Sequence, residues 1–128
     1  MRLLLDTHTL IWWMAADSSL SRSARDRIAG SQDPVFVSAA SAWEMAIKVS
    51  LGRLPSASGL ITDFEGLLRA DGFQSLVVTA THGIRAGLLP GPHKDPFDRM
   101  LIAQAQAENL AVVSNDLIFD RYGVRRIW

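Results

Sequence analysis

Short apolar runs alternate along this chain with segments of helical character, and this alternation is the feature that most restricts its fold. The first run, RLLLD, is continuously apolar up to its last residue, which is typical of a strand buried on both faces. Comparable runs recur along the chain and are always separated by at least one helical segment, so a hairpin-based sheet is not expected. The predicted strands lie at residues 2–6, 34–38, 75–78 and 111–114, with a fifth, edge strand at 124–128.

Between these strands, apolar residues recur at helical spacing, and the segments carry recognisable ends. Gly30, Gly52 and Gly72 stand where helices should stop, while Asp95 followed by Pro96 has the pattern of a helix cap and first helical residue. Alternating strands and helices require crossover connections, which predicts an α/β fold: a three-layer α/β/α sandwich with a mainly parallel central sheet of about five strands. Helices are expected at 7–16, 19–30, 41–52, 58–72, 80–88, 96–110 and 116–123.

The composition indicates a globular protein without a strong electrostatic preference. The chain has 128 residues, is 48% hydrophobic and balances 13 basic against 13 acidic residues, so we expect one domain over 1–128. With no net charge, contact with a polyanion must be local, and nothing opposes self-association, which favours a homodimer. Cysteine is absent and no apolar run reaches membrane-spanning length, so we expect a cytoplasmic protein with no membrane contact.

Four acidic residues fall where strands end or the following helices begin. Asp6 ends the first strand, and Asp116 directly follows the fourth. Glu44 is expected near the start of the helix after the second strand, and Asp98 in the first turn of the last long helix. Ligands of open parallel sheets bind outside the carboxyl ends of the strands, so these side chains should share one edge.

A purely structural interpretation stays open for most of these residues. Asp6 and Asp116 could each cap the helix that follows, and Glu44 stands three residues after Ser41, which is the spacing of a capping box. Asp98 is not needed as a cap because Asp95 precedes it in that position. The coincidence of four carboxylates is more informative than any one of them.

Carboxylates gathered on one edge must either keep protons or hold a cation. Two like charges about 4 Å apart repel by roughly 4 kcal/mol at an effective dielectric of about 20. Oxygen ligands without cysteine favour Mg²⁺ or Mn²⁺ over zinc. The histidines share no metal-ligand spacing, so we expect none of them to act directly in catalysis; they are His8, His82 and His93.

Four stretches of the chain resemble, in order and spacing, the motifs of PIN-domain proteins, and more narrowly the VapC-like toxins of bacterial type II toxin–antitoxin pairs. They are LLLDTHTLIWW, SAASAWEMAIKVSLGRL, HKDPFDRMLIAQAQ and VVSND, and they span nearly the whole chain. DPFDRMLIAQA and WEMAIK are the specific parts of this resemblance, and SND is the loosest.

The resemblance implies a single PIN-like nuclease domain over 1–128 that acts as the toxin of a toxin–antitoxin pair. It implies an endoribonuclease that depends on Mg²⁺ or Mn²⁺, hydrolyses RNA phosphodiesters and is controlled by a cognate antitoxin. The implied metal ligands are Asp6, Asp98 and Asp116, and the implied catalytic set adds Glu44. Supporting roles are implied for Ser114, two positions before the last aspartate, and more weakly for Thr7.

Local cations would hold the RNA backbone, and two of them lie beside the acidic residues. Lys48 stands four residues after Glu44, so an ion pair on the helix surface and a contact with substrate phosphate are both open. Arg99, next to Asp98, is open in the same way. Trp12 and Trp13 extend an apolar stretch in which at least one ring should enter the core, and an exposed remainder would suit a homodimer or antitoxin surface.

Other classes of protein remain as alternatives at this point. An RNA-processing PIN nuclease without a toxin role would use the same acidic residues. A Mg²⁺-binding phosphoryl-transfer or receiver-like domain also gathers acids at strand ends, although His8 stands where a haloacid-dehalogenase pattern needs its second aspartate. A partner-binding module whose acidic site only binds metal is a third alternative.

Overall fold

Five parallel strands form one sheet in the computed structural model, which describes residues 1–128, and their order is β3-β2-β1-β4-β5. Every neighbouring pair is parallel. The predicted central sheet is therefore confirmed, and it is parallel throughout. The strands are β1 (Leu3–Leu5), β2 (Val35–Ser38), β3 (Gln74–Leu76), β4 (Ala111–Val113) and β5 (Arg126–Ile127).

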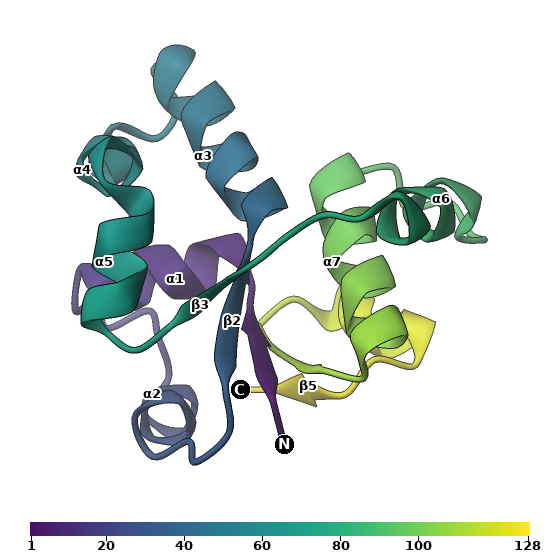
Figure 1. Cartoon of the computed structure of the whole chain (residues 1–128), viewed down its shortest axis with the longest axis horizontal. Helices are drawn as coiled ribbons and strands as arrows, with labels where there is room; N and C mark the ends of the chain where they lie inside the picture. The colour runs from purple at the N-terminus through teal and green to yellow at the C-terminus, as the bar shows by residue number, and fades with distance from the viewer.

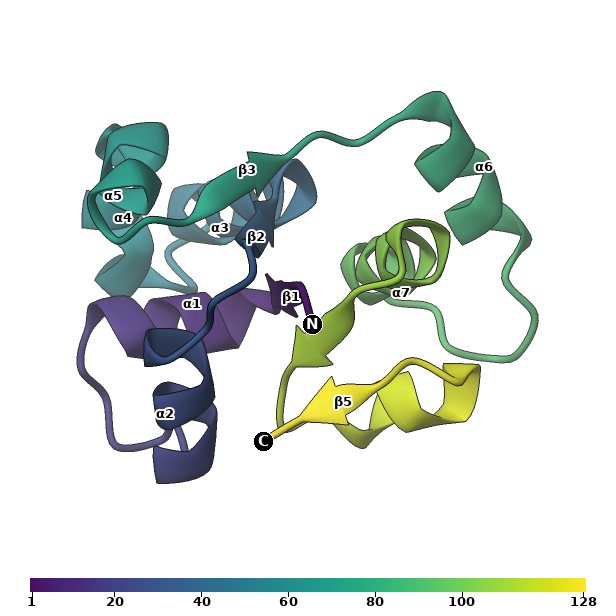
Figure 2. The ribbon, with the colours of Figure 1, turned by 60° about the horizontal axis from the view of Figure 1, so that its bottom comes forward.

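Helices cover both faces of this sheet, as a three-layer sandwich requires (Figures 1 and 2). One face is covered by α1, α2 and α5, and the other by α7, η2 and, outside α7, α6. None of the helices combines the length and the apolar character needed to cross a membrane. The α-helices are α1 (Thr7–Met14), α2 (Arg22–Ala29), α3 (Ala39–Ser50), α4 (Ser58–Thr62), α5 (Phe64–Ala70), α6 (Ala80–Leu88) and α7 (Pro96–Glu108). Two short 3-10 helices are labelled η1 (Pro55–Ala57) and η2 (Leu117–Tyr122).

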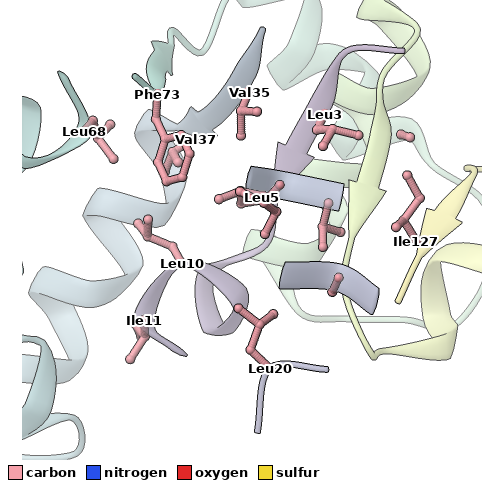
Figure 3. Close-up of a cluster of buried hydrophobic side chains, with 14 of the residues drawn as sticks. Leu3, Leu5, Leu10, Ile11, Leu20, Val35, Val37, Leu68, Phe73 and Ile127 are labelled. Atoms are coloured by element: carbon pink, nitrogen blue, oxygen red, sulfur yellow. The ribbon is translucent and has the colours of Figure 1, made fainter. Parts of the chain in front are cut away.

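Alternate residues of the central strand β1 enter two separate hydrophobic clusters. Leu3 and Leu5 face the larger cluster, together with Leu10 of α1 (Figure 3). Leu4 faces the smaller one, with Ile102 of α7 and Phe119 of η2. Successive side chains of a strand point to opposite faces, so a three-leucine run with no polar break fits a strand that is covered on both sides.

Several helices differ from the sequence-based expectation: α1, α2 and α7 are shorter than predicted, and the segment predicted as a helix at 116–123 is the 3-10 helix η2. Two further differences, at α3 and at 58–72, have clear local causes. The helix expected at 41–52 starts at Ala39, because the Ser38 hydroxyl accepts the Ala40 amide at 3.0 Å and caps the helix as soon as β2 ends. The capping box expected at Ser41 and Glu44 is therefore wrong, since both residues lie inside α3.

The helix expected at 58–72 is two short helices. The break falls at Asp63, whose backbone leaves the helical region at φ −141° and ψ 61°, so α4 ends before it and α5 begins after it. The apolar residues keep their helical spacing across the break, which is why the periodicity alone predicts one continuous helix.

The two tryptophans of α1 pack against the larger hydrophobic cluster and are half-buried. Trp12 meets Trp128 edge-on with ring centroids 5.9 Å apart, and Trp13 lies 5.6 Å from Phe73 while its indole N–H donates to Asp71 at 2.9 Å. Neither ring is fully buried: both pack against the margin of the core, whereas at least one was expected inside it. The most exposed large apolar side chains lie on other elements, among them Trp43, Val77, Ile84, Leu88 and Leu117.

Burial of β1 on both faces makes a direct stability prediction. We expect Leu4→Ala and Leu5→Ala each to lower the free energy of unfolding by about 2–5 kcal/mol, because each side chain is fully buried in a different cluster. Urea unfolding measures both. Leu117→Ala is the control, since Leu117 is 65% exposed and its loss should change stability by less than about 0.5 kcal/mol. A negligible effect of either core variant would contradict the sandwich.

Candidate functional site

Two of the candidate acids emerge side by side from the central strands. Asp6 follows β1 and Asp116 follows β4, and these strands are neighbours in the sheet. Both also cap helices: the Asp6 carboxylate accepts the Thr9 amide at 2.7 Å, and the Asp116 carboxylate accepts the Ile118 amide at 3.0 Å. The capping interpretation is therefore correct for both, and one carboxylate oxygen of each is used by the cap.

Ser114 connects the two strand ends. Its side chain is completely buried, its hydroxyl oxygen accepts the Asp116 amide at 3.0 Å, and it lies close enough to Asp6 to lower the pKa of that carboxyl. The serine expected to support the last aspartate thus contacts the backbone of one candidate acid and the side chain of another.

Asp98 joins this edge from the first turn of α7. Asp95 caps α7 by accepting the Phe97 and Asp98 amides at 2.9 and 3.1 Å, as predicted, so the Asp98 carboxylate is not used as a cap. Instead, the Asp98 carboxylate forms a hydrogen bond with His93, whose Nε2 is 3.0 Å from Asp98 Oδ2. The negative charge of Asp116 contributes to raising the pKa of Asp98, so the start of α7 lies near the carboxyl end of β4.

Glu44 lies in the second turn of α3, not at its start, and its charge is already balanced. One carboxylate oxygen accepts the Thr7 hydroxyl at 2.7 Å, and the other lies 2.5 Å from Lys48 Nζ. Ser41 Oγ is 2.9 Å from the same Thr7 oxygen. Of the two interpretations left open for Lys48, the structure shows the ion pair with Glu44.

Burial raises the pKa of two of the four acids. Asp6 is 9% exposed, and loss of hydration raises its pKa, against the lowering effects of Ser114 and the Thr9 amide. The pKa of Asp98 rises to about 6, first because of burial and then because of the negative charge of Asp95, while the hydrogen bond with His93 acts in the opposite direction. A carboxylate in such surroundings is stabilised when it binds a proton or a cation.

The donor set fits a hard divalent cation in its chemistry. No lysine or arginine forms an ion pair with Asp6, Asp98 or Asp116, and the basic groups that act on them are histidines: His93 is hydrogen-bonded to Asp98, and the charge of His8 lowers the pKa of Asp6. All the available donors except the imidazole are oxygens, which suits Mg²⁺ or Mn²⁺. No three of these groups already enclose a single point, so binding would draw the side chains together.

Arg99 has a structural role that sequence spacing does not reveal. Its guanidinium donates to three backbone carbonyls, those of Ala86, Leu89 and His93, at 3.1, 2.5 and 3.0 Å. These carbonyls belong to α6 and to the loop that connects it to α7. Arg99 is therefore occupied as a clamp on this loop, and the ion pair with Asp98, one of the two interpretations left open for it, is absent.

Two polar residues that the sequence-based assignment did not include join the site. His93 reaches Asp98 because the loop held by Arg99 turns back over α7, and no helical or strand spacing signals such a contact. Ser41 had a usable signal, since residues three apart on a helix share a face and Ser41 precedes Glu44 by three.

The raised pKa of Asp98 predicts how metal-free stability changes with pH. The folded protein holds a proton on Asp98 up to about pH 6, whereas the unfolded chain loses it near the ordinary aspartate value of 3.8. The stability contributed by this group is therefore fully present below pH 3.8 and is lost as the pH rises through about 6. We expect Asp98→Asn to stabilise the protein at neutral pH in EDTA by about 1–3 kcal/mol, and to have little effect at acidic pH.

Urea unfolding across this pH range, with EDTA present, measures the difference. Asp26→Asn is the matched control, because Asp26 is exposed on α2, forms no ion pair and should give the wild-type pH profile. Destabilisation by Asp98→Asn at neutral pH would instead assign Asp98 a structural role.

Comparisons with known proteins agree with this architecture. The PIN domain family matches residues 3–125 of the chain. No curated protein matches it.

Several solved structures share the fold at low sequence identity. VapBC2 from Rickettsia felis, in a crystal structure with a DNA fragment from their promoter, contains a chain that is 16% identical with a TM-score of 0.70, covering 100% of both chains. A chain of VapBC-1 from nontypeable Haemophilus influenzae is 16% identical with a TM-score of 0.65. A chain of DNA-bound VapBC from Salmonella typhimurium is 20% identical with a TM-score of 0.64. Each match covers 98% of this chain and 96% of the other. With the family match over nearly its whole length, this chain belongs to the PIN domain family, whose members are nucleases.

Proposed function

We propose that this chain is an endoribonuclease that depends on a divalent metal ion, and that it acts as the toxin of a toxin–antitoxin pair. The observation that supports the proposal is that Asp6, Asp98 and Asp116 lie along the carboxyl edge of a PIN-family sheet without a lysine or arginine partner. A receiver-like or phosphatase domain is not supported, because the family match is to PIN domains.

In this proposal the three aspartates hold the cation, and Mg²⁺ is the expected ion with Mn²⁺ as a substitute. A divalent cation bound there supplies positive charge against the negative charge that develops on the scissile phosphate. Ser114 keeps the ends of β1 and β4 in register by contacting both acids. His93 orients the Asp98 carboxylate through its hydrogen bond.

Glu44 has a positioning role in this proposal because its charge is already neutralised. It orients Thr7, the residue directly after Asp6, and it holds Lys48 at the rim. Lys48 keeps a third of its side chain exposed, so its remaining N–H groups are available to an RNA phosphate. Arg99 acts indirectly by fixing the loop that carries His93.

An antitoxin is the expected protein partner. The similar structures are of VapBC and FitAB, described in several cases with bound DNA. In this chain, three aspartates without a lysine or arginine partner are complementary to a cation from outside, and arginine–carboxylate contacts are strong and geometrically selective. We therefore propose that the partner inhibits by placing such a cation at Asp6 or Asp98. A homodimer stays a prediction.

Metal binding can be tested without measuring catalysis. A ligand that binds only the folded state raises thermal stability by mass action, so millimolar Mg²⁺ or Mn²⁺ should raise the Tm of the wild-type protein. The increase should be largely lost in Asp98→Asn and Asp6→Asn, and retained in Asp26→Asn. A Tm that does not respond to either ion would contradict the proposed metal site.

The reaction class is tested with labelled single-stranded RNA and with DNA of the same sequence. We expect Mg²⁺-dependent cleavage of the RNA, abolished by EDTA and reduced at least about 100-fold by Asp98→Asn, since loss of electrostatic stabilisation at a reacting phosphate has effects of this size. The Leu117→Ala variant should cleave like the wild type. Cleavage of DNA alone would overturn the RNA assignment, and cleavage of neither would overturn the nuclease proposal.

The biological role is tested by expression. The wild-type chain expressed alone should arrest growth, and Asp98→Asn should not. Coexpression with the neighbouring gene should restore growth, and the two proteins should copurify. Asp98→Asn should still bind that partner if apolar contacts contribute most of its affinity. Active nuclease without growth arrest would favour an RNA-processing enzyme.

A further inference from the structure

Two aromatic side chains meet where α3 approaches the first turn of α7. Trp43 and Phe97 pack edge-to-face, with ring centroids 5.2 Å apart and an interplanar angle of 73°. Each directly precedes a candidate site residue, since Trp43 is followed by Glu44 and Phe97 by Asp98. The aromatic pair is thus attached to the same two helices that supply half of the acidic site.

Trp43 is unusual among the tryptophans of this chain because its indole is left in solvent. It is 63% exposed, whereas Trp12, Trp13 and Trp128 are half-buried and pack on the larger hydrophobic cluster. Phe97 supports one side of the indole and leaves most of it uncovered. A large, rigid, exposed aromatic surface beside a candidate active site is an available stacking platform.

A pocket of about 510 Å³ lies against this pair, within the ~300–1,000 Å³ range typical of small-ligand sites. Its apolar walls come from α3, α6, α7 and the segment after β3, with Val78 and Met100 among them. The charged residues of the lining are Lys94 and Arg99, and no acidic residue contributes. In a chain with no net charge, this pocket is therefore locally positive.

The two cations of the pocket differ in what they can do. Arg99 already donates to three backbone carbonyls, so it adds positive charge to the pocket but has few N–H groups free to bind a ligand. Lys94 is exposed and forms no hydrogen bond or ion pair, and it stands one residue after His93 in the loop next to Asp98. A free ammonium group next to an exposed indole matches the two parts of a nucleotide, its phosphate and its base.

We propose that this pocket is a nucleobase subsite, in which a base flanking the scissile phosphate of single-stranded RNA stacks on Trp43 while Lys94 contacts an adjacent phosphate. The proposal rests on the ribonuclease function proposed above and names the form of RNA that the site accepts. Bases in a duplex are already stacked and paired, so only an unpaired strand can present a base face to the indole. The positive lining and the absence of acids favour a polyanion over a neutral apolar segment of protein.

The test is binding of RNA by chains that cannot cut it. Asp98→Asn provides the background, and the probe is a short fluorescein-labelled single-stranded oligoribonucleotide measured by fluorescence anisotropy. Adding Trp43→Ala should raise the Kd about 5- to 150-fold, the range expected for loss of one stacked base. Trp43→Phe should stay near the parent value because it keeps an aromatic face. Leu51→Ala is the control, since Leu51 is 59% exposed at the far end of α3.

A second probe separates stacking from general damage to the surface. The second probe is an abasic strand of the same length, which keeps the ribose-phosphate backbone but has no bases. With this probe, the difference in Kd between the parent chain and its Trp43→Ala variant should vanish, because only the backbone remains to be bound. In the cutting-competent wild-type background, Trp43→Ala should raise KM with kcat nearly retained, as expected when ground-state and transition-state binding are lost together.

The contrary outcomes are equally specific. An unchanged Kd in Trp43→Ala, or an equal loss in Leu51→Ala, would overturn the subsite while RNA cleavage by the wild type still supports the proposed function. Sedimentation velocity adds one more check: if Trp43→Ala converts a dimer to a monomer, the pocket is covered by a second copy of the chain and is not a base subsite. Absence of RNA cleavage by the wild type would contradict the proposed function itself.

Discussion

The central strand β1 is hydrogen-bonded to β2 on one side and β4 on the other, and its three leucines are buried on both faces. The chain leaves this strand at the carboxyl edge of the sheet, so the next residue, Asp6, remains largely inside the protein. Burial of β1 therefore positions a carboxylate where its charge is poorly hydrated. The adjacent strand β4 ends at the same edge and delivers Ser114 and Asp116 to the same place.

The distribution of cations around this edge gives the acidic residues different characters. Lys48 neutralises Glu44, and Arg99 donates to backbone carbonyls, so neither reaches the three aspartates. Burial raises the pKa values of Asp6 and Asp98, and no lysine or arginine ion pair opposes this effect. Helix capping uses one carboxylate oxygen of Asp6 and one of Asp116 but none of Asp98, so capping alone does not explain this group of acids.

Much of the architecture follows from local sequence. Three features were predictable: the strand pattern, the parallel sheet between layers of helices, and the cap and first residue of α7. Short apolar runs and helical spacing report burial directly. The start of α3 was not, since Ser38 competes with Ser41 as a cap and only the end of β2 decides between them. The break at Asp63 was hidden because the apolar spacing continues through it.

The candidate acids Asp6, Asp98 and Asp116 could be chosen from sequence because each stands at a predictable strand end or helix start. The sequence by itself determined that Asp6 and Asp116 lie at one edge, since parallel strands end together, whereas the position of Asp98 depends on how α7 packs against the sheet. Only the tertiary structure decided how they are partnered: that His93 reaches Asp98, that Arg99 turns to the loop after α6, and that Trp43 meets Phe97. The residues in these contacts are not separated by the regular spacing of a helix or a strand, so no sequence pattern predicts them. The contacts form only when the helices pack on the sheet.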